Sequence, residues 1–174
     1  MGTREVQQVQ EAQARFQALL DAHKGILFKV CNGYCRNRDD REDLAQEIVV
    51  QLWRSFGRYD ERLRFSTWMY RIALNVAISA YRRERTRTRH VLAADASVLE
   101  VADEPPVASG RIEELYALIE GLEPMERALV LLVLDGLSHR EIGDVLGLSE
   151  SNVGTKLERL RKRMRQRAQG DPRA

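Results

Sequence analysis

The stretch that decides the fold lies near the end of the chain: LSHREIGDVLGLSESNVGTKLERLRKRM, residues 137–164. Ser138, followed three positions later by Glu141, predicts a capping box in which each side chain accepts a backbone N–H at a helix start. Gly147 marks the end of that helix, because glycine tolerates the left-handed conformation of a C-cap. Ser149 is placed to cap the next helix. The stretch therefore predicts a short helix, a tight turn and a longer basic helix.

The second of these helices has two different faces. One buried stripe is predicted from apolar residues at spacings of four, three and four: Val153, Leu157, Leu160 and Met164. The opposite face carries side chains able to contact phosphates or base edges: Ser151, Asn152, Thr155, Arg159 and Lys162. This arrangement is typical of a DNA-binding helix-turn-helix. An ordinary helical hairpin with a solvated basic face is the alternative.

Charge is segregated along the rest of the chain, although the net charge of the 174 residues is only +2. Residues 156–167 contain seven Lys or Arg and one Glu, and residues 82–89 contain five Arg and one Glu. Between them, residues 91–110 contain four acidic residues and no Lys or Arg. This pattern predicts two anion-binding surfaces joined by an acidic connector. Two merely solvated charged faces are the alternative.

Helical periodicity runs through the chain, and signals for β-strands are nearly absent. We predict an all-α protein of two small helical domains joined by a flexible linker, the second domain containing the helix-turn-helix. The predicted domains are residues 1–89 and 111–174. The linker, residues 90–110, contains the adjacent Pro105 and Pro106 and shows no amphipathic period.

Several helix starts are predicted from capping residues. Asp40 is expected to cap a helix over residues 41–56, and Ser66 one that runs to about residue 83. In the latter helix we expect an inward stripe of Trp68, Ile72, Val76 and Ala80. Pro124 is expected at the first position of a helix capped by Glu123.

Two further stretches of the first domain indicate binding. Asp43, Gln46, Glu47 and Val50 lie at i, i+3, i+4 and i+7 of one helix, and this mixed acidic and apolar stripe suits a partner protein's surface. A plain solvent face is the alternative. The loop over residues 57–65 alternates arginines with Tyr59, Leu63 and Phe65, as single-stranded nucleic acid requires. Core packing of the aromatic rings is the alternative there.

The sequence indicates no chemistry of its own. There are three histidines, no Gly-rich phosphate loop and no spaced carboxylate pair in a recognisable cleft, so we predict neither an enzyme nor a cofactor. Cys31 and Cys35 are the only cysteines, and we expect reduced, partly buried thiols rather than a metal site or a disulfide. No apolar run approaches the length of a membrane span, and the N-terminus lacks a signal peptide's apolar core. We therefore expect a cytoplasmic protein.

Nearly the whole chain, from about Phe16 to Arg165, resembles the extracytoplasmic-function (ECF) group of bacterial RNA polymerase sigma factors. AQEIVVQLW, residues 45–53, is similar to the family's segment that binds the polymerase clamp helices. STWMYRIALNVAISAYRRERTR, residues 66–87, is similar to its promoter-melting segments. LEPMERALVLLVLDGLSHREIGDVLGLSESNV, residues 122–153, is similar to its −35-binding helix-turn-helix. The order and separation of these segments make the resemblance specific.

The resemblance implies a set of site residues. Polymerase binding is implied for Asp43, Leu44, Gln46, Glu47 and Val50. Contact with −10 DNA, including a flipped base, is implied for Tyr59, Arg62, Arg64, Phe65, Ser66, Asn75, Ser79, Arg82 and Arg83. Contact with −35 DNA is implied for Arg140, Ser151, Asn152, Thr155, Lys156 and Arg159. The implied partners are core RNA polymerase and promoter DNA. Many family members also bind an anti-sigma factor, which this sequence alone does not identify.

Two glycines depart from the family pattern. Gly154 stands where the family often has a basic residue, and it weakens its helix by about 1 kcal/mol relative to Ala. Gly143 replaces a more common Ala, an exchange expected to be sterically harmless. A stand-alone helix-turn-helix repressor or activator is the alternative function, although it explains neither the Arg–aromatic loop nor the acidic linker.

Overall fold

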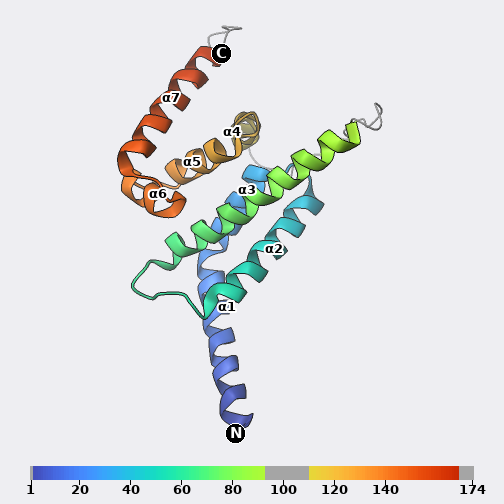
Figure 1. The fold of residues 1–174 in the computed structure, drawn as a ribbon, viewed down its shortest axis with the longest axis vertical. Helices are drawn as coiled ribbons and strands as arrows, with labels where there is room; N and C mark the ends of the chain where they lie inside the picture. The colour runs from blue at the N-terminus through green and yellow to red at the C-terminus, as the bar shows by residue number, and fades with distance from the viewer. Residues whose placement is uncertain (1, 93–109, 169–174) are drawn as a thin grey trace. The chain divides into compact units, whose positions relative to one another are not determined.

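The computed structural model describes residues 2–92 and 110–168, and the regular secondary structure of these residues is entirely helical (Figure 1). The helices are α1 (Gly2–Tyr34), α2 (Arg38–Phe56), α3 (Phe65–Leu92), α4 (Gly110–Glu120), α5 (Pro124–Leu134), α6 (His139–Leu146) and α7 (Glu150–Ala168). The chain divides into two compact units, Met1–Pro106 and Val107–Ala174. The predicted all-α class with two helical parts is confirmed. Most of the predicted linker, including Pro105 and Pro106, lies outside the described residues.

The first unit is a bundle in which α1, α2 and α3 each pack against the other two. Its core contains Val30 from α1, Ile48 and Leu52 from α2, and Met69 and Ala73 from α3, all fully buried. The N-terminal part of α1 extends beyond the other two helices (Figure 1). Val6 and Val9 in that part are accordingly exposed.

Two predicted helix starts were wrong. Helix α2 begins at Arg38, and its N-cap is Asn37, whose side-chain oxygen accepts the backbone N–H of Asp40 at 2.7 Å. The Asn37 amide in turn donates to the Asp40 carboxylate at 2.7 Å, so Asp40 stabilises the first turn from inside it. Helix α3 begins at Phe65, one residue before the predicted cap Ser66.

The predicted inward stripe of α3 was displaced by one residue. Trp68, Ile72, Val76 and Ala80 are only half-buried, whereas the fully buried positions are Met69, Tyr70, Ala73, Leu74 and Ala77. The reason is that α3 packs against α1 and α2 together, so its buried arc is wider than one stripe.

The second unit is built around α5, which contacts α4, α6 and α7. Pro124 occupies its first turn behind the N-cap Glu123, as predicted, and the Glu126 carboxylate accepts the Glu123 backbone N–H at 3.2 Å. Buried Arg127 donates from Nε to the carbonyl of Leu122 at 2.9 Å and from its other end to the carbonyl of Glu120. A cation at these carbonyls satisfies the end of α4 and fixes it against α5.

Candidate binding surfaces

The predicted protein-binding stripe lies on α2. Asp43, Gln46 and Val50 are exposed, and Glu47 is partly exposed. Leu44 is buried in the bundle core, so its side chain is not on this surface and can only support it from below. Trp53, one further step along the same face from Val50, is 40% exposed and extends the stripe. The i, i+3 spacing from Val50 was the signal that could have identified Trp53.

The predicted Arg–aromatic loop contains a half-buried ring. The Tyr59 ring lies 4.9 Å from Trp68 and 5.5 Å from Phe65, centroid to centroid, and its hydroxyl donates to the carbonyl of Leu63 at 2.7 Å. Burial is the largest cause that raises the Tyr59 pKa, so the phenol stays protonated. Phe65 is buried beneath it and offers no ring face to a base. Tyr59 and half-buried Trp68 are therefore the rings near the surface.

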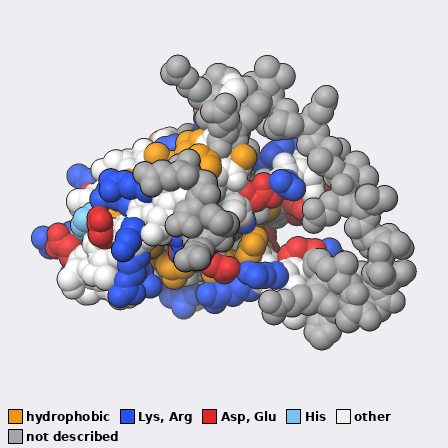
Figure 2. Space-filling view, turned by 90° about the horizontal axis from the view of Figure 1, so that it is seen from above, with side chains coloured by type: hydrophobic (Ala, Val, Ile, Leu, Met, Phe, Trp, Pro, Cys, Tyr) orange, Lys and Arg blue, Asp and Glu red, His pale blue; other side chains and the backbone are white. Residues whose placement is uncertain are grey.

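The cations of this loop are partly neutralised within the chain. Arg62 pairs with Asp60 at 2.7 Å, and the hydrogen bonds of this pair lower the Asp60 pKa and raise the Arg62 pKa. Arg64 is exposed, and Ser66 is half-buried inside the first turn of α3. In the space-filling view of one face, Lys and Arg side chains reach the surface beside Asp and Glu side chains (Figure 2).

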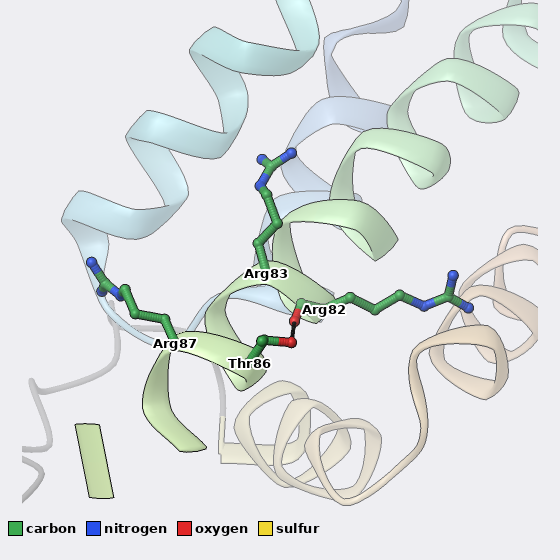
Figure 3. A pocket seen from close by; sticks show the side chains of 4 residues that line it. All are labelled: Arg82, Arg83, Thr86 and Arg87. Atoms are coloured by element: carbon green, nitrogen blue, oxygen red, sulfur yellow. Dashed lines mark hydrogen bonds between the residues drawn. The ribbon is translucent and has the colours of Figure 1, made fainter. Parts of the chain in front are cut away.

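A polar face continues along α3. Asn75, Ser79, Arg82 and Arg83 are exposed, as a nucleic-acid contact requires. A shallow depression is lined by Arg82, Arg83, Thr86 and Arg87 (Figure 3). Thr86 and Arg87 were missing from the predicted set, although the arginine run of residues 82–89 contained the signal. Arg83 donates to both carboxylate oxygens of Glu47 at 2.9 Å, which connects this face to the α2 stripe.

The helix-turn-helix has the predicted local structure. The Ser138 hydroxyl accepts the Glu141 backbone N–H at 3.3 Å, and the Glu141 carboxylate accepts that of Ser138 at 2.9 Å. Gly147 adopts φ 69° and ψ 34°, the left-handed C-cap that favours glycine. The Ser149 hydroxyl accepts the Asn152 backbone N–H at 3.3 Å and caps α7. These caps fix the turn between α6 and α7.

Helix α7 separates a buried stripe from an exposed one. Val153, Leu157 and Leu160 are buried and Met164 is half-buried, as predicted. The predicted DNA-facing side chains Ser151, Asn152, Thr155 and Arg159 are exposed, as is Arg140 on α6, whereas Lys156 is half-buried. The Thr155 hydroxyl donates to the carbonyl of Ser151 at 3.0 Å, which leaves its methyl group and remaining lone pair for a ligand.

Gly143 is not interchangeable with Ala, contrary to the sequence-based expectation. A Cβ at this buried position would lie 2.5 Å from the carbonyl oxygen of Leu148, which is backbone and cannot easily move. The same turn uses Gly143 as an acceptor, because its carbonyl accepts the Leu148 N–H at 3.0 Å. At Gly154, by contrast, an added Cβ would make an ordinary 3.6 Å contact with the His139 ring.

Both cysteines are thiols, with Cys31 buried and Cys35 half-buried. Burial raises the pKa of the Cys31 thiol to about 12, so it is protonated and unreactive near neutral pH. Within residues 2–92 and 110–168, no group of three His, Cys, Asp or Glu side chains is placed to hold a metal ion. None of the helices in these ranges is long and apolar enough to cross a membrane.

Known proteins share both halves of this arrangement. The model of sigma-70 region 2 matches residues 19–87, and that of sigma-70 region 4 matches residues 112–164. The chain is 29% identical over 161 residues to the ECF RNA polymerase sigma factor SigX of Bacillus subtilis, covering 86% of this chain and 83% of the relative.

Two solved structures share the fold. CnrH, in complex with the cytosolic domain of CnrY, has a TM-score of 0.66 and 22% identity, with 94% of this chain and 95% of that chain covered. The sigma factor RpoE of Bartonella quintana, in complex with the anti-sigma factor NepR, has a TM-score of 0.64 and 19% identity, with 92% and 98% covered. Two sigma-70 region matches in the family's order and an ECF relative along most of the chain lead to one conclusion: this protein belongs to the ECF group of RNA polymerase sigma factors.

Proposed function

We propose a division of labour among the surfaces of this sigma factor, which binds core RNA polymerase and directs promoter-specific initiation. The α2 stripe of Asp43, Gln46, Glu47 and Val50 binds the polymerase, with Trp53 at its end. Residues 1–89 recognise and help melt −10 DNA, residues 111–174 recognise −35 DNA, and residues 90–110 link them. The observation that supports this most is the pair of polar, basic faces on two separate helical units, one of them adjoining an acidic stripe.

The −10 contact has two parts in this proposal. Tyr59 and Trp68 offer ring surface to an unpaired base, while Arg62 and Arg64 approach phosphates. Asn75, Ser79, Arg82 and Arg83 approach the duplex just upstream. Phe65 and Leu44, being buried, hold these surfaces in place rather than contacting a ligand.

The −35 contact is made by α7 in the major groove. Ser151, Asn152, Thr155 and Arg159 face the bases or phosphates, with Arg140 of α6 and Lys156 at the flanks. Holding two DNA-binding units on one polymerase raises their effective concentration, so neither unit needs high affinity alone. The free energy of polymerase docking and duplex contacts together offsets the cost of unstacking a base, which is roughly a few kcal/mol.

The protein acts by binding and supplies no catalytic group of its own in this proposal. Its site of action is the cytoplasm, where core polymerase is found. An anti-sigma factor that covers the α2 stripe is a further proposed partner. The support is that the fold-matched RpoE of Bartonella quintana is seen in complex with one.

Run-off transcription with core polymerase and the purified protein tests the proposal. A promoter-dependent product is expected, and its absence across a promoter library would contradict the function. A gel shift with the protein alone separates the rival role of a stand-alone repressor or activator. Tight, specific duplex binding without polymerase would support that rival, whereas the sigma role predicts weak binding.

A further inference from the structure

One ion pair joins the two surfaces of the first unit. Arg83 of α3 donates through Nη2 to both carboxylate oxygens of Glu47 of α2, at 2.9 Å each, across 36 positions of sequence. Glu47 belongs to the proposed polymerase-binding stripe, and Arg83 belongs to the proposed −10 DNA contact. In the protein without its ligands, each of these side chains is therefore paired with the other and not with polymerase or DNA.

The neighbouring arginine is in a different state. Arg82 points away from Arg83 in the depression that they share with Thr86 and Arg87 (Figure 3). Among the described residues no carboxylate pairs with Arg82, and its side chain is exposed. Adjacent arginines on one helix thus differ: Arg82 is open to an anion, and Arg83 is held by an acid.

Arg83 and Glu47 can leave this ion pair for other partners at little cost in free energy. The side chains of Arg83 and Glu47 are 62% and 39% exposed, so water screens their attraction. An exposed pair of this kind changes an equilibrium constant by about 1.4-fold to 5-fold. A DNA phosphate offers Arg83 two anionic oxygens, as the carboxylate does, and a basic group on the polymerase offers Glu47 a positive charge in place of Arg83.

We propose that the Glu47–Arg83 pair couples polymerase docking to promoter contact. Docking draws Glu47 to the polymerase, and the released Arg83 turns to a backbone phosphate beside Arg82 and Thr86. This inference rests on the proposed function, because it assumes that the α2 stripe binds polymerase. Linkage requires the reverse effect as well: DNA that engages Arg83 frees Glu47 and favours docking. Removing Arg83 frees Glu47 in the same way.

The test measures the affinity of core polymerase for fluorescently labelled full-length variants. Arg83→Ala is expected to bind polymerase about twofold to fivefold more tightly than the unaltered protein, because Glu47 is already released. Arg82→Ala is the matched control, since it removes the same charge from an adjacent residue whose proposed role is DNA contact alone. Measured without DNA, its affinity for polymerase is expected to stay unchanged. In a Glu47→Gln background, Arg83→Ala is expected to have no effect.

Each result separates the coupling from the function on which it rests. If Glu47→Gln leaves polymerase affinity unchanged, the assigned docking stripe is wrong and the coupling fails with it. If Glu47→Gln weakens docking but Arg83→Ala does not strengthen it, only the coupling is overturned. An equal gain from Arg82→Ala and Arg83→Ala would mean a general charge effect and would also overturn it.

Discussion

The two proposed DNA-binding surfaces of this sigma factor differ in how their cations are held. In the first unit, Arg62, Arg83 and Arg87 pair with Asp60, Glu47 and Glu84 at 2.7, 2.9 and 3.0 Å. On α7, the described structure pairs none of Lys156, Arg159 and Lys162 with a carboxylate. These cations of the proposed −35 surface are therefore open to an anion, whereas Arg62 and Arg83 of the proposed −10 surface must first leave their carboxylate partners.

This difference fits the roles proposed for the two surfaces. Duplex −35 DNA has a regular shape that a rigid helix can contact without rearrangement, and the caps around α6 and α7 supply that rigidity. On the proposed −10 surface, Arg62 and Arg83 can bind a phosphate only after their pairs with Asp60 and Glu47 open. The predictions below test this contrast, beginning with the largest expected effect.

Gly143→Ala is expected to cause the largest loss of stability, and to cause it in the second unit. The added Cβ would meet the Leu148 carbonyl oxygen at 2.5 Å, and such overpacking costs about 1–3 kcal/mol of unfolding free energy. Urea unfolding followed by circular dichroism measures the loss. Gly154→Ala is the matched control in the next helix: its contact is ordinary, so stability should hold or rise by up to about 1 kcal/mol. Equal effects of both changes would contradict the steric argument.

Arg159→Ala and Arg62→Ala compare an arginine that has no carboxylate partner in the described structure with one paired to Asp60, and promoter affinity is the quantity measured. Loss of Arg159 should weaken holoenzyme binding to promoter DNA by about 1–3 kcal/mol if it contacts a base edge. Arg62→Ala should cost less, because breaking the Arg62–Asp60 pair offsets part of any phosphate contact. Filter binding at two salt concentrations measures both. A larger loss from Arg62→Ala would reverse the comparison.

Substitutions at the helix caps test, with a smaller loss of stability, whether the two units act independently. Ser138→Ala removes the cap of α6, and Asn37→Ala removes the cap of α2; each should cost about 1 kcal/mol of stability. The functional effects should differ, with Ser138→Ala weakening −35 DNA binding and Asn37→Ala weakening polymerase binding. Fluorescence anisotropy with −35 DNA and with core polymerase measures these two effects. Loss of both activities in either variant would show that the units are not independent.

The smallest expected effect concerns the thiols. Burial raises the Cys31 pKa from the ordinary thiol value of 9.0 to about 12. Between these two pH values the folded protein keeps the thiol proton, whereas the unfolded chain loses it. The Cys31 contribution to stability is therefore complete below about pH 9 and declines between about pH 9 and 12. At pH 8, iodoacetamide should label half-buried Cys35 before Cys31, as mass spectrometry can show. Cys35→Ser is the control, and fast labelling of Cys31 in it would contradict the assigned burial.

Local features were predicted well because short-range chemistry decides them. The Ser138–Glu141 box, the left-handed Gly147 and the Ser149 cap each involve residues within three or four positions. The capping residue of α2 was misassigned to Asp40 because Asn37 and Asp40 both have capping side chains, and only the packed helix shows where the turn begins. The site residues remain predictions, apart from the exposure that the structure gives them.

Sequence alone determined the helical class, the helix-turn-helix with its caps and the segregation of charge, because these depend on periodicity, turn chemistry and composition. Only the tertiary structure decided which predicted contact residues are available. Leu44 and Phe65 are buried because α1, α2 and α3 enclose them, and the Leu148 carbonyl oxygen leaves too little room for a Cβ at Gly143. The Glu47–Arg83 pair joins residues 36 positions apart, a distance that only the packing of α2 against α3 can close.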